Sequence, residues 1–138
     1  MTNATRARIP DATLVSVILE RIARDLGTVL GQELSFAPPT ATRAIARPAG
    51  EGLVHISFKL GLVKDGELSG HGTLLVPLPE AITMACLLLM MPEDSVAARR
   101  EETLLDLALK DALLEISSMI AGAVNTALAE LGASGWSV

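Results

Sequence analysis

The sequence predicts an α+β fold, in which an antiparallel β-sheet carries two long helices on one face and a shorter helix beside them. Two neighbouring segments within residues 54–78 alternate between apolar and polar residues around an Asp-Gly dipeptide, as the strands of a β-hairpin do. Two longer segments, one toward each end of the chain, repeat apolar residues at helical spacing. A shorter apolar segment follows the hairpin and predicts the third helix.

The first of these helices is predicted over residues 10–30. Its apolar residues recur every three or four positions, with charged residues on the other side, so one face is expected to be buried. Pro10 suits an early helical position, and Gly27 or Gly31 is expected to end the helix. Residues 37–52 are rich in proline and glycine and predict a loop, with a short edge strand around 43–47.

The hairpin is the clearest β signal in the chain. Residues at even positions from 54 to 62 and from 68 to 78 are apolar or glycine, so they predict one buried face. The turn is expected at Lys64-Asp65-Gly66, because Asp-Gly favours a tight hairpin turn. His55 and His71 both lie among the alternate residues that are expected to face outward, so they are candidate cross-strand neighbours. Neither has a Cys, Asp or Glu at ligand spacing, so we expect no metal site there.

The second half of the chain is predicted to be mainly helical. A helix opens at Pro79 and runs to about Met91, followed by a charged connection over residues 93–100. A long helix is then expected from 101 to 131, where Gly132 stops it, and the tail from 133 to 138 predicts a brief strand. Residues 10–138 therefore form one predicted domain, preceded by a flexible arm at 1–9.

Composition excludes several classes of protein. Half of the 138 residues are apolar, which excludes a disordered chain. The net charge is −5, with no tyrosine and one tryptophan, so a general nucleic-acid binder is not expected. The most apolar run, residues 81–91, is too short to span a bilayer, so no membrane insertion is expected. The first ten residues are polar and Cys86 is the only cysteine, which together predict a cytoplasmic protein.

One narrow stripe of the long helix carries polar or small residues in place of core residues. These residues are spaced by four, three, four and three, which places them above one another on one helix face. They are Asp111, Glu115, Ser118, Gly122 and Asn125. A glycine inside a helix costs about 1 kcal/mol relative to alanine, so Gly122 predicts the close approach of another backbone. The serines lack a positioned histidine, so no Ser-His-Asp hydrolase is expected.

The segment from Asp111 to Gly122 resembles the signature helix of the CheC/CheX/FliY chemotaxis phosphatases. That signature has Asp or Ser, three residues, Glu, two residues and Asn, and an apolar pair and a small-Gly step often follow. The hairpin, the helix from Pro79 with its Met90-Met91 end and the first helix resemble the same family, so the resemblance covers residues 11–136. It implies a CheX-like α+β fold. Where the family has its catalytic Asn, this chain has Ser118.

The resemblance also implies a site and a partner. In the family, the Glu binds a lysine of a phosphorylated response regulator, and the Asn orients water for attack on the aspartyl phosphate. A Mg²⁺ ion held by the regulator assists. Carried over residue by residue, Glu115 is the docking acid, Asp111 fills the Asp/Ser position, and Gly122 lies beneath the partner. Ser118 would hold the water in place of Asn, and Asn125 extends the partner-binding face. No cofactor of the chain's own is implied.

Two functions remain open on the sequence. One is a signalling protein that binds a phosphorylated CheY-like response regulator through the face from Asp111 to Asn125, with at most weak phosphatase activity. The alternative is a non-catalytic scaffold or oligomerisation protein of a chemotaxis or motility complex. Family members continue into further strands after the signature helix, whereas only residues 133–138 follow it here. Two interpretations follow: the chain is a truncated variant, or a second copy or another subunit covers the incomplete sheet edge.

Overall fold

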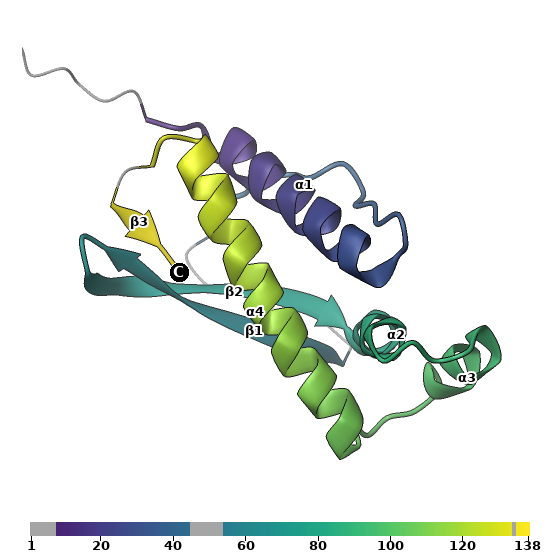
Figure 1. The fold of residues 1–138 in the computed structure, drawn as a ribbon. Helices are drawn as coiled ribbons and strands as arrows, with labels where there is room; N and C mark the ends of the chain where they lie inside the picture. The colour runs from purple at the N-terminus through teal and green to yellow at the C-terminus, as the bar shows by residue number, and fades with distance from the viewer. Residues whose placement is uncertain (1–7, 45–53, 134) are drawn as a thin grey trace, which may run out of the picture.

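The computed structural model describes residues 8–44, 54–133 and 135–138, and it has an α+β architecture (Figure 1). This part of the chain forms four helices and three strands. In order they are α1 (Asp11–Leu30), β1 (His55–Lys64), β2 (Glu67–Pro77), α2 (Leu78–Leu88), α3 (Glu93–Arg99), α4 (Leu107–Glu130) and β3 (Trp136–Ser137). The predicted antiparallel sheet with two long helices and a shorter one is thereby confirmed.

The sheet has the order β2-β1-β3, and both pairings are antiparallel. The hairpin turn is at Asp65-Gly66, and both residues have positive φ angles of 50° and 84°, as a tight type I′ turn requires. On the side of β1 away from β2, β3 pairs only with Val63 and Lys64, next to the hairpin turn. The rest of β1 on that side has no strand neighbour among the described residues.

The C-terminal strand is fixed to the hairpin turn by its backbone. The N–H of Asp65 donates to the carbonyl of Gly135 at 2.8 Å. Gly135 has a φ of 81°, and a Cβ at this position would clash with the Asp65 carboxylate. The left-handed backbone and this close approach both favour glycine there. The Nζ of Lys64 lies 5.5 Å from the centre of the Trp136 ring, close enough for a cation–π contact.

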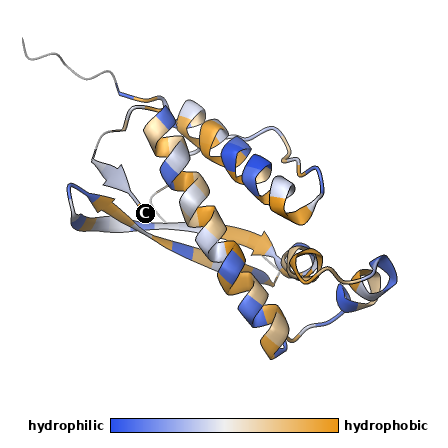
Figure 2. Ribbon diagram, viewed as in Figure 1, coloured by the Kyte–Doolittle hydropathy of each residue, from blue (hydrophilic) through white to orange (hydrophobic). Residues whose placement is uncertain are grey.

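The core lies where α1, α2 and α4 meet over one face of the hairpin (Figure 1). Figure 2 shows α2 as strongly hydrophobic, and its residues Ala81, Ile82 and Cys86 have no exposed surface. From the sheet, Phe58 is the most deeply buried side chain, at 4% exposure. Burial raises the pKa of the Cys86 thiol, so this residue acts as a small core side chain.

Helix α1 agrees with the sequence prediction, while the segment before α4 does not. Helix α1 ends at Gly31, which adopts the left-handed conformation that a helix C-cap favours. The predicted charged connection is instead a short helix, α3, and the long helix begins at Leu107 rather than at 101. Asp106 explains the late start, because its side chain accepts a hydrogen bond from the N–H of Leu109 as an N-cap.

Two further predictions concern local structure near the hairpin. Helix α2 ends at Leu88, three residues before the predicted end, and Met90 then has a positive φ of 57°. The short strand proposed around residues 43–47 lies mostly outside the described residues. Arg43 and Ala44 are described and are not in a strand, and the Arg43 guanidinium binds the Asp11 carboxylate at 2.7 Å.

Helix α4 is long and apolar enough to cross a membrane by length and composition alone. In this fold it is the central core helix, because Ile116 and Ile120 have no exposed surface and 44% of its most apolar window is buried inside the protein. A core helix of a soluble protein has the same properties, so the fold is compatible with a soluble protein.

Candidate functional site

The candidate site lies on the side of α4 that faces away from the core. Asp106 caps the helix, and its side chain also binds the guanidinium of Arg99 on α3. The hydrogen bond from the Leu109 N–H and then the bond from Arg99 lower the pKa of Asp106 below its usual value. These contacts fix the first turn of α4 and with it the direction in which the next turns present their side chains.

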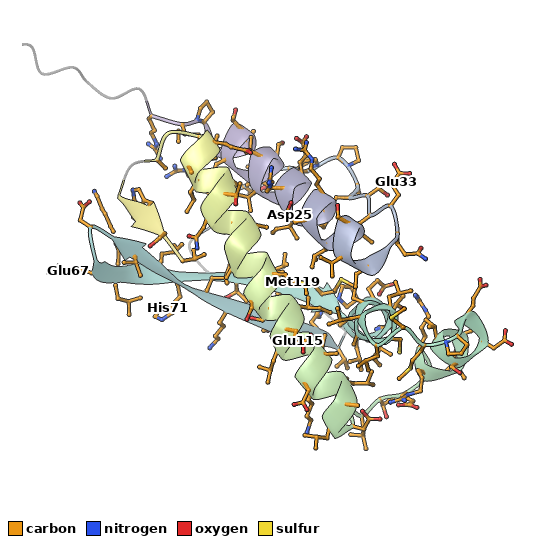
Figure 3. The ribbon with its side chains drawn as sticks, in the orientation of Figure 1. Asp25, Glu33, Glu67, His71, Glu115 and Met119 are labelled. Atoms are coloured by element: carbon orange, nitrogen blue, oxygen red, sulfur yellow. The ribbon has the colours of Figure 1, made fainter. Side chains whose placement is uncertain are left out.

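Both acidic residues of the stripe are open to solvent. Asp111 and Glu115 are exposed, and neither carboxylate has a hydrogen bond or ion pair within the described part of the chain. Glu115 projects from the first half of α4 (Figure 3). A carboxylate on a rigid helix with no internal partner is available to a cation on another molecule.

Ser118 is also exposed, and it lies one turn beyond Glu115 and two turns beyond Asp111 on the same side of α4. Its Oγ donates a long hydrogen bond of 3.4 Å to the carbonyl of Leu114 in the preceding turn. This contact is weak, so the hydroxyl can turn outward to hold a water molecule. The side chain is short, however, and it keeps any bound water close to the helix surface.

Gly122 is exposed and has open space around it. A Cβ added to Gly122 would meet no atom within 4 Å. The close backbone approach that the sequence predicted at this position is therefore not made by any described residue of the chain itself.

Asn125 has a structural role in this fold. Its Nδ2 donates to the carbonyl of Val138 at 3.2 Å, and its Oδ1 accepts from the N–H of Val138 at 2.7 Å. The side chain is half-buried beneath the C-terminal residue. Asn125 thus ties the end of the chain to α4, and its amide is already occupied, unlike the groups at Glu115 and Ser118.

Two exposed leucines on this face were not singled out from the sequence. Leu107 is 74% exposed and Leu114 is 68% exposed. With Asp111 and Ser118 they repeat the four-three-four spacing of one helix face, and this spacing was the signal that could have identified them. Exposed leucines next to charged and polar residues can supply the apolar part of a protein–protein contact surface. We refer to Leu107, Asp111, Leu114, Glu115, Ser118 and Gly122 as the α4 outer face.

The two histidines of the hairpin do not form a second site. His55 is opposite Pro77 and His71 is opposite Gly61, so the expected cross-strand proximity of the histidines was wrong. His71 lies on the side of the hairpin away from the helices (Figure 3). Within the described residues, no group of three or more His, Cys, Asp or Glu side chains is arranged to hold a metal ion.

Searches for related proteins found no match: no family model, no curated protein and no solved structure is similar to this chain.

Proposed function

We propose that this protein is a cytoplasmic CheX/CheC-like signalling protein that binds a phosphorylated CheY-like response regulator through the α4 outer face. The observation that carries the proposal is the exposure of Glu115 and Ser118 on one side of a rigid helix, flanked by two solvent-exposed leucines. A docking surface of this kind combines apolar contact area with charges that select the partner.

Each group on the α4 outer face has a proposed role. Glu115 pairs with a lysine of the regulator, and Asp111 adds negative charge one turn earlier. Leu114 and Leu107 supply apolar area, and the bare backbone at Gly122 lets the partner come close. The regulator brings its own Mg²⁺ ion beside the aspartyl phosphate.

Ser118 limits the catalytic part of the proposal. An acyl phosphate is already labile, so its hydrolysis needs mainly a positioned water and stabilisation of the phosphoryl charge. An Asn side chain can accept a hydrogen bond from water and donate one to a phosphoryl oxygen. The serine side chain is shorter, so it reaches less far toward the phosphoryl group of a bound partner. We therefore propose binding with at most weak aspartyl-phosphate phosphatase activity.

The test compares purified response regulators from the same genome in phosphorylated and unphosphorylated form. The protein is expected to bind the phosphorylated form more tightly, and Glu115→Gln is expected to weaken this binding about two- to fivefold, as loss of a partly exposed ion pair does. Glu20→Gln is the matched control, because Glu20 is an exposed helical glutamate on α1, away from the α4 outer face. Equal binding by all regulators in both forms would refute the proposal.

Catalysis is tested by following loss of phosphate from the bound regulator. The wild-type protein is expected to accelerate the loss only slightly, and Ser118→Asn is expected to increase the rate at least tenfold. If Ser118→Asn binds the phosphorylated regulator but leaves the rate unchanged, the protein is a non-catalytic binding or scaffold protein, and the phosphatase part of the proposal fails.

A further inference from the structure

An apolar groove lies between α1 and the hairpin. It has a volume of about 540 Å³, and its far end is formed by the C-terminal half of α4 and by β3. Helix α1 packs mainly against α4, so Leu14 and Ile18, which line the groove, are only partly buried. Protein interiors are closely packed, with few voids larger than a water molecule. A groove of this size is therefore a candidate binding site.

The lining of the groove excludes most classes of small molecule. All of the residues that line it are described, and only Thr73 and Trp136 among them have polar side-chain atoms. Sugars, nucleotides and peptides carry many polar groups, and each of these costs free energy when it is buried without a partner. A hydrocarbon chain has no such groups. The volume of the groove also lies in the range of about 300–1,000 Å³ that is typical of small-molecule sites.

A lysine lies at the rim of the groove. Leu60, Leu62 and Lys64 are alternate residues of β1 and therefore share one face of the strand, and both leucines line the groove. The Lys64 Nζ lies over the ring of Trp136, which also lines the groove. Lys64 is exposed and forms no ion pair within the described part of the chain. Its ammonium group is thus available to an anion beside the apolar lining.

We propose that the groove binds a long-chain fatty acid, with the hydrocarbon chain along the lining and the carboxylate on Lys64. Burial of the chain supplies most of the affinity, and the exposed ion pair mainly fixes its direction. A free fatty acid fits this site better than an anionic membrane surface does, because membrane surfaces are bound by clusters of Lys and Arg. Here Asp65 follows Lys64, Glu67 is its strand partner, and the net charge is −5.

The bound chain would connect α1 with the sheet. Leu14 and Ile18 of α1 and Gly72 and Leu74 of β2 line the same groove, so one ligand contacts both elements. A ligand that binds only the folded state stabilises it, so fatty acid is expected to raise the melting temperature. The groove shares no residue with the α4 outer face. The fatty-acid site therefore does not depend on the proposed binding of a response regulator, and each proposal can fail without the other.

Dodecanoate is the probe, used below the concentration at which it forms micelles. Trp136 is the only tryptophan of the chain, so its fluorescence reports on the groove directly. Its emission is expected to move to shorter wavelength and to saturate as dodecanoate is added, while the melting temperature rises. Hexanoate is expected to bind much more weakly, because it buries a shorter chain. An emission and a melting temperature that dodecanoate leaves unchanged would overturn the proposal.

Gly72→Leu tests the groove itself. Gly72 lines the groove as the strand partner of Leu60, and a Cβ there meets no atom within 4 Å. The added side chain is therefore expected to fill part of the groove in a folded protein and to weaken dodecanoate binding by about tenfold or more. Ser57→Leu is the matched control, since Ser57 is exposed on β1 and does not line the groove. Equal affinity of the wild type and a folded Gly72→Leu protein would refute the site.

Lys64→Glu tests the contact with the carboxylate. It is expected to weaken the binding of dodecanoate by about fivefold or more and to leave the binding of uncharged 1-dodecanol unchanged. Lys59→Glu is the matched control, because Lys59 is an exposed lysine of the same strand that does not line the groove. If Lys64→Glu binds dodecanoate as tightly as the wild type does, the assignment of the carboxylate to Lys64 is wrong.

Vesicles of phosphatidylglycerol distinguish a free fatty acid from a lipid surface. The protein is expected to stay in solution when the vesicles are sedimented, because a single lysine beside two carboxylates does not hold it on an anionic membrane. A protein that sediments with the vesicles and does not bind dodecanoate would overturn the proposal in favour of a membrane surface.

Discussion

Glu115, Ser118 and Asn125 occupy one stripe of α4, yet the structure gives them different roles. The carboxylate of Glu115 is open to solvent, and the Ser118 hydroxyl makes only a long contact with its own helix. The amide of Asn125 is held by the backbone of Val138. Helical spacing can place residues on one face, but it does not show which of them the rest of the chain has already bound. The sequence therefore predicted where these residues lie on α4, but not that the Asn125 amide is hydrogen-bonded to the backbone of Val138.

Gly122→Ala is expected to stabilise the protein by about 0.5–1 kcal/mol, because alanine loses less backbone entropy in a helix and its methyl group meets nothing here. Denaturant unfolding measures the change. Gly31→Ala provides the contrast, since Gly31 has a φ of 67° and alanine there is expected to destabilise the protein.

The Gly122→Ala variant also tests whether a partner docks closely over this position. If the regulator docks over Gly122, the stabilised Gly122→Ala protein is expected to bind the regulator more weakly than the wild type. A gain in stability together with unchanged binding would mean that no partner approaches this part of the helix closely.

At the scale of elements, the periodicity of apolar residues predicted the regular strands and helices. It did not predict the bulge in the hairpin or the boundary between α3 and α4. The hairpin register follows the alternation only up to the bulge at Ser69, where Leu68 becomes the partner of Val63. This shift turns Leu68 to the opposite face, where it is 64% exposed although the alternation placed it inside. A bulge has no fixed sequence signature, so the alternation alone could not reveal it.

The boundary between α3 and α4 shows the same limit. Residues 101–106 have the charged and apolar composition of a helix start, and the sequence therefore predicted one. The ion pairs of Arg99 with Glu102 and with Asp106 instead hold this segment as a turn between two helices. These side-chain contacts join residues three and seven positions apart, and the propensity of each single residue does not contain them.

Asp106 is expected to contribute to stability in a pH-dependent way. Its pKa is lowered in the folded protein, so its contribution is present above the unfolded pKa of about 4 and is lost as the pH falls through the folded value. Asp106→Ala is expected to lower the melting temperature at pH 7 by about 4 °C, through loss of the cap and of the bond to Arg99.

Asp106→Asn separates the two contributions, because asparagine caps a helix as well as aspartate does but carries no charge. Its melting temperature at pH 7 is expected to lie between those of the wild type and Asp106→Ala. The difference between Asp106→Asn and the wild type should be smaller at pH 3 than at pH 7, as followed by circular dichroism, because the contribution of the charge decreases below the unfolded pKa of about 4. A difference of equal size at both pH values would contradict the role of the charge.

For the molecule as a whole, the junction between α1 and α4 is held by packing far more than by charge. The guanidinium of Arg21 on α1 binds Asp25 of the same helix and Glu130 of α4, each at 3.1 Å. The guanidinium is partly exposed and the Glu130 side chain is half-exposed. Such pairs contribute between about zero and 1 kcal/mol. Ile22, the next residue of α1, is only 2% exposed and packs in the core with Ile120 of α4.

Ile120→Ala is therefore expected to lower the free energy of unfolding by about 2–5 kcal/mol, because it removes apolar contact and leaves a cavity in a fully buried position. Arg21→Ala, which removes the ion pair with Glu130 across the junction and the pair with Asp25 within α1, is expected to cost less than about 1 kcal/mol. Denaturant unfolding at low and high salt measures both. Salt should reduce only the small effect of Arg21, because the core contact does not involve charge. A larger loss from Arg21→Ala than from Ile120→Ala would show that ion pairs, and not the apolar core, hold α1 against α4.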